Sequence, residues 1–182
     1  VVVVMMVLAM IGCRSSGDLR GDGPRALEAT EDEARRAMAQ APEAVDEGLG
    51  RFLELFDTFE AASVAEAALR VYADDAYFHD GFVELEGAGA IADYLARSAE
   101  HATSLEIEIE EIVRSDSGVY VRWMMLFTTS GGKEVHAPGI SHLRFSPDGH
   151  IVYHRDYWDA SGALASMVPV VGSVLEAVRK RL

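Results

Sequence analysis

The side chains best suited to acid–base chemistry gather between residues 140 and 159. They are two imidazoles, a carboxylate and an indole, belonging to His142, His154, Asp156 and Trp158. An imidazole titrates near neutral pH and a carboxylate accepts a proton, so this set could transfer protons on a small molecule. Buried polar groups need partners, so their concentration predicts a cavity with a polar lining.

A β-hairpin is expected to position these groups. Ser146-Pro147-Asp148-Gly149 has the composition of a tight turn, because proline presets φ and glycine adopts a positive φ. If Phe145 and Ile151 pair beside this turn, His142 lies opposite His154. The two-residue period of a strand then places the aspartate and the tryptophan on the same face.

The same side chains also have the composition of a metal site with two histidines and one carboxylate. Such a site would require both imidazoles to converge across two strands. The chain has one cysteine, Cys13, and no CxxC motif. We therefore predict no metal and no cofactor.

Length and charge narrow the class of protein. The 182 residues suit one domain with extra sequence at its beginning, and 49% of them are apolar, which is enough for a core. The formal net charge of −14 argues against a nucleic-acid partner, since phosphate binding needs clustered Lys and Arg.

The first 13 residues are expected to be a signal segment. Residues 1–12 form an apolar run, and Met10-Ile11-Gly12-Cys13 resembles a bacterial lipobox, whose cysteine is acylated. The resemblance implies export and attachment to the bacterial membrane, in the cell envelope, through lipidated Cys13. A short anchor or an incorrect gene start are the alternatives.

Residues 14–42 are predicted to be a flexible tether. Arg14 to Thr30 shows no apolar periodicity and carries no expected fold, whereas Glu31 to Met38 could form a short helix that ends near Pro42.

The domain itself is expected to span residues 43–182, beginning with three helices. The first carries an apolar stripe at helical spacing, the second follows a capping-box pattern at Ser63–Glu66, and the third covers Ala88 to Arg97. The stripe consists of Val45, Leu49, Phe52, Leu53, Phe56 and Phe59.

Four antiparallel strands are predicted next. Leu105 to Glu110 alternates between apolar residues and glutamates, Glu111-Ile112 suggests a bulge, and two further strands lead into the hairpin. Apolar residues at helical spacing predict a C-terminal helix within residues 161–182. This order predicts an α+β fold with the helices on one face of a curved sheet.

Residues 43–172 resemble the NTF2-like superfamily, in particular its SnoaL-like and ketosteroid isomerase-like branches. The resemblance rests on Tyr72-Ala73-Asp74-Asp75-Ala76, on Leu143-Arg144-Phe145 with Asp148-Gly149, and on the run from His154 to Asp159. It implies an NTF2-like (cystatin-like) cone around a cavity. The fold hosts isomerases, cyclases, hydrolases and non-catalytic binding modules, so it does not decide the activity.

Three enzyme branches suggest roles for individual residues. The polyketide cyclase branch is similar at His142 and Asp156, where the aspartate serves as base and the histidine assists the developing oxyanion. Ketosteroid isomerases are similar at Asp80, the general-base position. The two oxyanion donors of that branch are replaced by Phe56 and Ser141, and each such donor is worth about 3 kcal/mol.

Limonene-epoxide hydrolases are similar at Arg122 and Asp156, but Met124 replaces the third member of their Asp-Arg-Asp set. A structural Arg122–Asp156 pair is the alternative to a catalytic aspartate. We also expect seven residues to line the cavity: Arg122, Tyr120, Met124, Phe56, Ser141, His154 and Trp158.

Two functions follow from these observations. The first is a membrane-tethered, non-catalytic domain whose apolar cavity binds a hydrophobic small molecule. The second is an acid–base enzyme that uses Asp156 with His142 and Asp80. The resemblance also suggests a homodimer.

Overall fold

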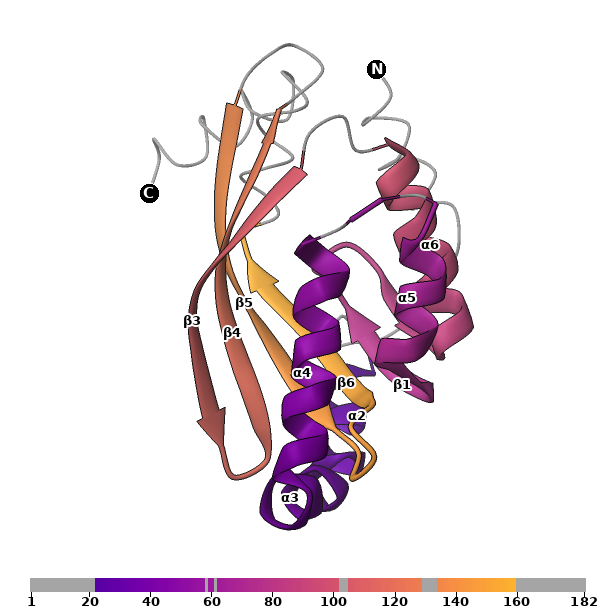
Figure 1. Ribbon diagram of the computed structural model, residues 1–182, viewed down its shortest axis with the longest axis vertical. Helices are drawn as coiled ribbons and strands as arrows, with labels where there is room; N and C mark the ends of the chain where they lie inside the picture. The colour runs from indigo at the N-terminus through magenta and orange to yellow at the C-terminus, as the bar shows by residue number, and fades with distance from the viewer. Residues whose placement is uncertain (1–21, 58, 61, 102–104, 129–133, 160–182) are drawn as a thin grey trace, which may run out of the picture.

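The fold is a curved sheet with helices on both faces (Figure 1). The computed structural model describes residues 22–57, 59–60, 62–101, 105–128 and 134–159. The described helices are α2 (Gly23–Ala29), α3 (Glu31–Gln40), α4 (Pro42–Asp57), α5 (Val64–Val71) and α6 (Ala88–His101). The strands are β1 (Tyr72–His79), β2 (Glu84–Glu86), β3 (Leu105–Ser115), β4 (Gly118–Thr128), β5 (Glu134–Phe145) and β6 (Ile151–Trp158).

The sheet confirms the predicted α+β class and adds two strands. Its order is β2-β1-β6-β5-β4-β3, and all neighbours are antiparallel except β1 and β6. The meander from β3 to β6 is the predicted one. The expected short extended piece near residues 76–80 is the end of the longer strand β1, which pairs with the last strand of the meander.

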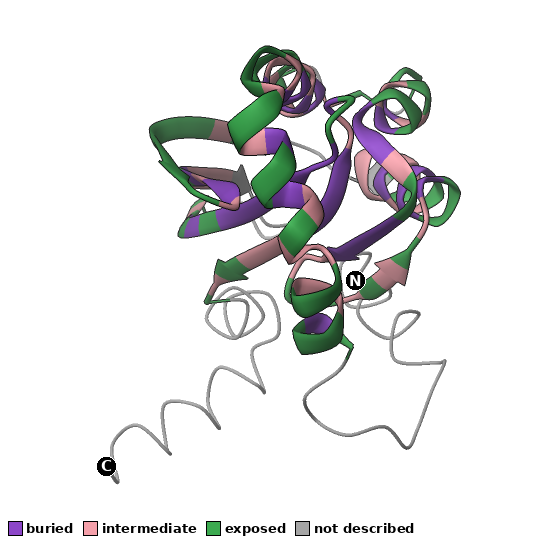
Figure 2. Cartoon of the chain, turned by 90° about the horizontal axis from the view of Figure 1, so that it is seen from below, coloured by how far each residue is buried: buried purple, intermediate pink, exposed green. Residues whose placement is uncertain are grey.

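Helix α4 crosses one face of the sheet and supplies much of the core. Val45, Leu49 and Phe52 of the predicted stripe are buried, and Leu53, Phe56 and Phe59 are partly buried against the same core. Figure 2 shows buried residues where helices and strands face one another and exposed residues on the outer sides of the helices. The C-terminal half of α4 contributes Phe52, Leu53 and Phe56 to the wall of a pocket.

The turn between β5 and β6 locks against α4. Gly149 has a φ of +82°, as the turn composition predicted, and Arg51 donates to its carbonyl oxygen at 2.8 Å. A Cβ on Gly149 would lie 2.2 Å from the carbonyl oxygen of Ala44. The turn therefore fixes where the hairpin begins relative to the helix.

The predicted tether is partly folded. Residues 23–29 form helix α2, and Arg144 of β5 donates to the carbonyl oxygen of Leu27 and pairs with Glu31 of α3. The expectation of no fold between Arg14 and Thr30 is therefore wrong for residues 23–29. Its cause is a long-range contact with a buried arginine, which local composition does not reveal.

Two further predictions lie outside the described residues: the signal segment with Cys13, and the C-terminal helix within residues 161–182. No helix in the described part of the chain is long and apolar enough to span a membrane.

Candidate functional site

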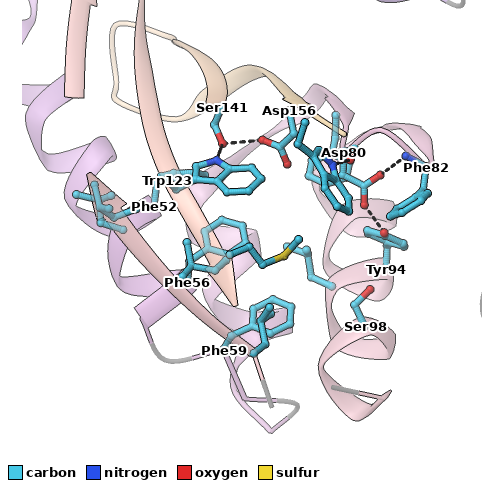
Figure 3. Close-up of a pocket in the computed structure, with 18 residues that line it drawn as sticks. Phe52, Phe56, Phe59, Asp80, Phe82, Tyr94, Ser98, Trp123, Ser141 and Asp156 are labelled. Carbon is cyan, nitrogen blue, oxygen red and sulfur yellow. Dashed lines mark hydrogen bonds between the residues drawn. The ribbon is translucent and has the colours of Figure 1, made fainter. Parts of the chain in front are cut away.

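A pocket of about 260 Å³ opens between α4, α6 and the inner face of the sheet (Figure 3). Its wall is mostly aromatic and aliphatic. The lining residues are Phe52, Leu53, Phe56, Phe59, Phe78, Asp80, Phe82, Tyr94, Leu95, Ser98, Leu105, Ile107, Ile109, Trp123, Met125, Ser141, Asp156 and Trp158.

Helix α4 builds one wall with a row of aromatic rings. Phe52 and Phe56 lie one helical turn apart and meet edge to face, with ring centroids 5.0 Å apart. Phe59, beyond the end of the helix, stacks on Phe56 at 5.9 Å. The row extends away from the acidic end of the pocket (Figure 3).

Asp156 holds the centre of a hydrogen-bond network. The Trp123 indole N–H donates to the Ser141 hydroxyl at 2.9 Å, and that hydroxyl donates to Asp156 Oδ1 at 2.6 Å. His154 Nε2 lies 2.9 Å from the same oxygen. Within the described residues Oδ2 accepts no hydrogen bond, and it projects toward the interior of the pocket (Figure 3).

His154 is fully buried behind the pocket wall. Its Nδ1 lies 2.8 Å from the Tyr72 hydroxyl, and its ring stacks on that of Tyr72. Every partner is satisfied if Nε2 carries the proton and donates to Asp156, while the tyrosine donates to Nδ1. Burial raises the pKa of Tyr72 well above its usual range, which keeps that hydroxyl protonated.

Asp80 is the second carboxylate of the pocket. Its Oδ1 accepts from the backbone N–H groups of Phe82 and Val83 at 2.9 and 3.0 Å, and its Oδ2 accepts from the Tyr94 hydroxyl. Burial raises the pKa of Asp80, and the nearby charge of Asp156 adds to that effect, while the hydrogen bonds oppose it. Asp80 therefore caps the loop that follows β1.

Trp158 connects the Asp80 loop to the last strand. Its indole N–H donates to the Asp80 carbonyl oxygen at 2.6 Å, and its ring meets Phe82 edge to face at 5.2 Å. Asp80, Asp156 and Ser141 thus lie at one end of an otherwise apolar pocket (Figure 3).

The family follows from the sequence together with this geometry. The model of the SnoaL-like domain matches residues 51–154, which is more than half of the chain and runs from the last turns of α4 into β6. The chain belongs to the SnoaL-like domain family.

Solved structures show the same fold at low identity. A candidate SnoaL-like polyketide cyclase from Jannaschia sp. CCS1 superposes with a TM-score of 0.58 at 16% identity, over 67% of this chain and 92% of that one. An LEH-like epoxide hydrolase from M. tuberculosis gives 0.53 at 20%, over 66% and 85%.

A third structure is a hypothetical protein with a ketosteroid isomerase-like fold from Catenulispora acidiphila DSM 44928, in complex with trimethylamine. It gives a TM-score of 0.54 at 16% identity, over 63% of this chain and 87% of that one. No curated protein matches the chain significantly.

Within this SnoaL-like domain, His142 lies on the other face of the sheet. Phe145 and Ile151 pair beside the turn, as predicted, but the register shifts directly afterwards, so that Leu143 lies opposite His154. A one-residue shift moves every following side chain to the opposite face. The predicted partnership of His142 with the pocket carboxylate is therefore wrong.

His142 instead belongs to an aromatic cluster beneath α2 and α3. Its ring stacks on Tyr120 at 4.4 Å and meets Tyr153 at 5.3 Å. Burial lowers its pKa to about 4, and the charge of Arg144 adds to this. The imidazole is therefore neutral near pH 7 and contributes no proton to the pocket.

Arg122 also points away from the pocket. Its guanidinium lies 2.8 Å from the Glu110 carboxylate and 3.3 Å from that of Glu111, and half of its side chain is exposed. The Arg122–Asp156 pair and the water-activating set of epoxide hydrolases are therefore absent. Tyr120 and Met124 alternate with Arg122 on this outer face, so their predicted place in the pocket wall is wrong as well.

The sequence prediction missed Trp123, which links Ser141 to the aromatic wall. Arg122 carried the relevant signal: had this charged side chain been placed on the outer face rather than in the pocket, strand alternation would have placed Trp123 inward. Gly139 carried another: a Cβ there would lie 2.2 Å from the Trp123 ring, so the glycine permits the indole to cross β5.

No group of three or more His, Cys, Asp or Glu side chains suited to a metal occurs in the described residues. The alternative metal site of His142, His154 and Asp156 is not assembled, because His142 lies across the sheet from the other two.

Proposed function

We propose that this SnoaL-like domain binds a small, largely apolar organic molecule in the pocket. The carrying observation is a cavity of about 260 Å³ whose aromatic and aliphatic wall ends at two carboxylates. Ligand sites commonly combine apolar walls with a few polar groups that orient the ligand. Burial of apolar surface supplies affinity, at about 25 cal/mol per Å² before the costs of association are subtracted.

Native mass spectrometry of the purified protein tests this proposal. We expect retained or added apolar ligand on the wild type and its loss in Ser98→Trp, because the larger side chain on α6 fills the pocket. Glu100→Trp, at an exposed position of the same helix, is the matched control. Equal ligand occupancy in all three proteins contradicts the proposal.

An acid–base enzyme is the second candidate, favoured by the free Oδ2 of Asp156. In that case Asp156 accepts a proton from a carbon acid, and Asp80, whose pKa is raised by burial, is the second acid–base group of the pocket. Exchange of the α-protons of a cyclic ketone in D₂O, followed by NMR, tests it. Catalysed exchange that falls about 100-fold in Asp156→Asn supports the enzyme, and exchange at the buffer rate contradicts it.

We further propose lipidation at Cys13, which rests on the lipobox-like sequence alone. Loss of membrane association in a Cys13→Ser variant expressed in bacteria supports it; unchanged association contradicts it. The expected homodimer stays a prediction, and light scattering after gel filtration would test it.

A further inference from the structure

The polar end of the pocket restricts which ligands it can hold. Resting on the proposed function, we propose that the bound molecule is a small apolar amine whose protonated nitrogen contacts Asp156 while its hydrocarbon part packs against the aromatic wall. The inference depends on three features of the site: a hydrogen-bond acceptor without a protein donor, hydrogen-bond donors that already have protein partners, and the faces of aromatic rings.

The acceptor is Asp156 Oδ2. Among the described residues, Ser141 and His154 both form their hydrogen bonds with Oδ1. A ligand can therefore donate to Oδ2 without breaking a hydrogen bond within the protein. Asp156 is largely buried, with 16% of its side chain exposed. An acceptor placed this deeply favours a ligand that brings a donor, and a charged donor most strongly.

The side-chain donors beside the two carboxylates are already used. Trp123 donates to Ser141, and Trp158 donates to the carbonyl oxygen of Asp80. Tyr94 donates its hydroxyl hydrogen to the Asp80 carboxylate. A ligand carboxylate or carbonyl at the acidic end of the pocket would therefore find the indole N–H groups and the Ser141 and Tyr94 hydroxyls already donating to protein acceptors.

The charges around the site are one-sided. Asp80 and Asp156 line the same pocket, and among the described lining residues there is no Lys, Arg or His. His154 contacts Oδ1 of Asp156 and the Tyr72 hydroxyl from behind the wall, so Oδ2 still faces the pocket. An ammonium group in the pocket would offset two partly desolvated carboxylates.

The faces of the tryptophan rings can pack against the alkyl groups of an ammonium ion. Trp158 is held by its bond to the Asp80 backbone and by the edge of Phe82, and Trp123 is held by Ser141. Rings fixed in this way attract cations placed over their faces without losing further conformational freedom. Aromatic rings and a carboxylate together recognise alkylammonium groups.

Three probes of matched shape test the inference: N,N-dimethylcyclohexylamine, isopropylcyclohexane and 1-cyclohexylethanone. The first carries a protonated nitrogen where the second has carbon, and the third has a carbonyl. Both tryptophans of the chain line the pocket, so intrinsic fluorescence reports binding. We expect the amine to bind at least about tenfold more tightly than the hydrocarbon.

Variants assign that preference to the carboxylate. In Asp156→Asn the affinity for the amine should fall to that for the hydrocarbon, while the hydrocarbon's own affinity stays unchanged. That second titration also shows that the variant still folds around its pocket. Asp93→Asn, at an exposed position on α6, removes the same charge elsewhere and should keep the preference.

Each other outcome overturns the inference in a distinct way. If the amine and the hydrocarbon bind equally tightly, the apolar binding site is supported but the proposed preference for a cation is wrong. Tightest binding of the ketone removes it too and favours the acid–base enzyme. Binding of none of the three, together with an empty protein by native mass spectrometry, contradicts the proposed function itself.

Discussion

Gly139→Ala tests how β5 and Trp123 together form the pocket wall. A Cβ at this position would lie 2.2, 2.4 and 2.6 Å from three carbons of the indole, far inside van der Waals contact. The indole is rigid and buried, so it must rotate away rather than bend. Rotation breaks its 2.9 Å hydrogen bond to Ser141.

The cost can be estimated from these contacts. Overpacking a core costs about 1–3 kcal/mol, and a lost buried hydrogen bond about 0.5–1.5 kcal/mol. Alanine restricts the unfolded chain more than glycine does, which returns about 0.4–1 kcal/mol. We therefore expect Gly139→Ala to lower the free energy of unfolding by about 0.5–4 kcal/mol.

Urea denaturation followed by circular dichroism measures this change, and tryptophan emission follows the indole. The matched control is Gly50→Ala in α4, where a Cβ meets no atom within 4 Å. That variant should stabilise the protein by about 0.5–1 kcal/mol through helix propensity. A Gly139→Ala protein with wild-type stability and unchanged emission would refute the described packing of Trp123.

Three further predictions concern other parts of the domain. Gly149→Ala should destabilise the protein by about 1–3 kcal/mol in urea denaturation, because φ is positive and the added Cβ meets the backbone of α4; a neutral result would contradict the turn geometry. The pKa of His142 is depressed to about 4 from its ordinary 6.5, so its contribution to stability is full above pH 6.5 and is lost as the pH falls toward 4. The unfolding free energy of the wild type should fall by about 2–3 kcal/mol more over that range than that of His142→Phe, and parallel pH profiles would show that the imidazole is not buried. Tyr72→Phe removes the hydroxyl that His154 Nδ1 contacts and should cost about 1–2 kcal/mol, whereas a stability equal to the wild type would remove this bond from the network.

Helical periodicity predicted much of the first half of the domain. The α4 stripe from Val45 to Phe56 follows from residue spacing alone, because apolar positions three and four apart must share one face. The alternation from Leu105 onward likewise predicted β3 and its irregularity near Glu111, where the pairing of β3 with β4 shifts register. These features depend on the spacing of residues that are close together in the chain, and that spacing can be read from the sequence directly.

Residue spacing could not predict on which face of the sheet the side chains of the β5–β6 hairpin lie. The pairing of Phe145 with Ile151 was predicted, yet one extra residue in β6, Val152, reversed the faces of His154 and Asp156 relative to His142. Such a bulge leaves one residue without a cross-strand partner, and the local sequence gives little sign of it. Helix α2 was missed for a related reason, since its anchor, Arg144, is more than 100 residues away in the chain.

The indole N–H signals in a two-dimensional ¹H–¹⁵N NMR spectrum test the central claim most directly. The chain contains two tryptophans, Trp123 and Trp158, both in the pocket wall and both hydrogen-bonded through Nε1. On addition of N,N-dimethylcyclohexylamine, ligand entry predicts saturable shifts of both signals in the wild type and much weaker ones in Asp156→Asn. Unchanged indole signals at saturating amine would contradict a ligand site between these two rings.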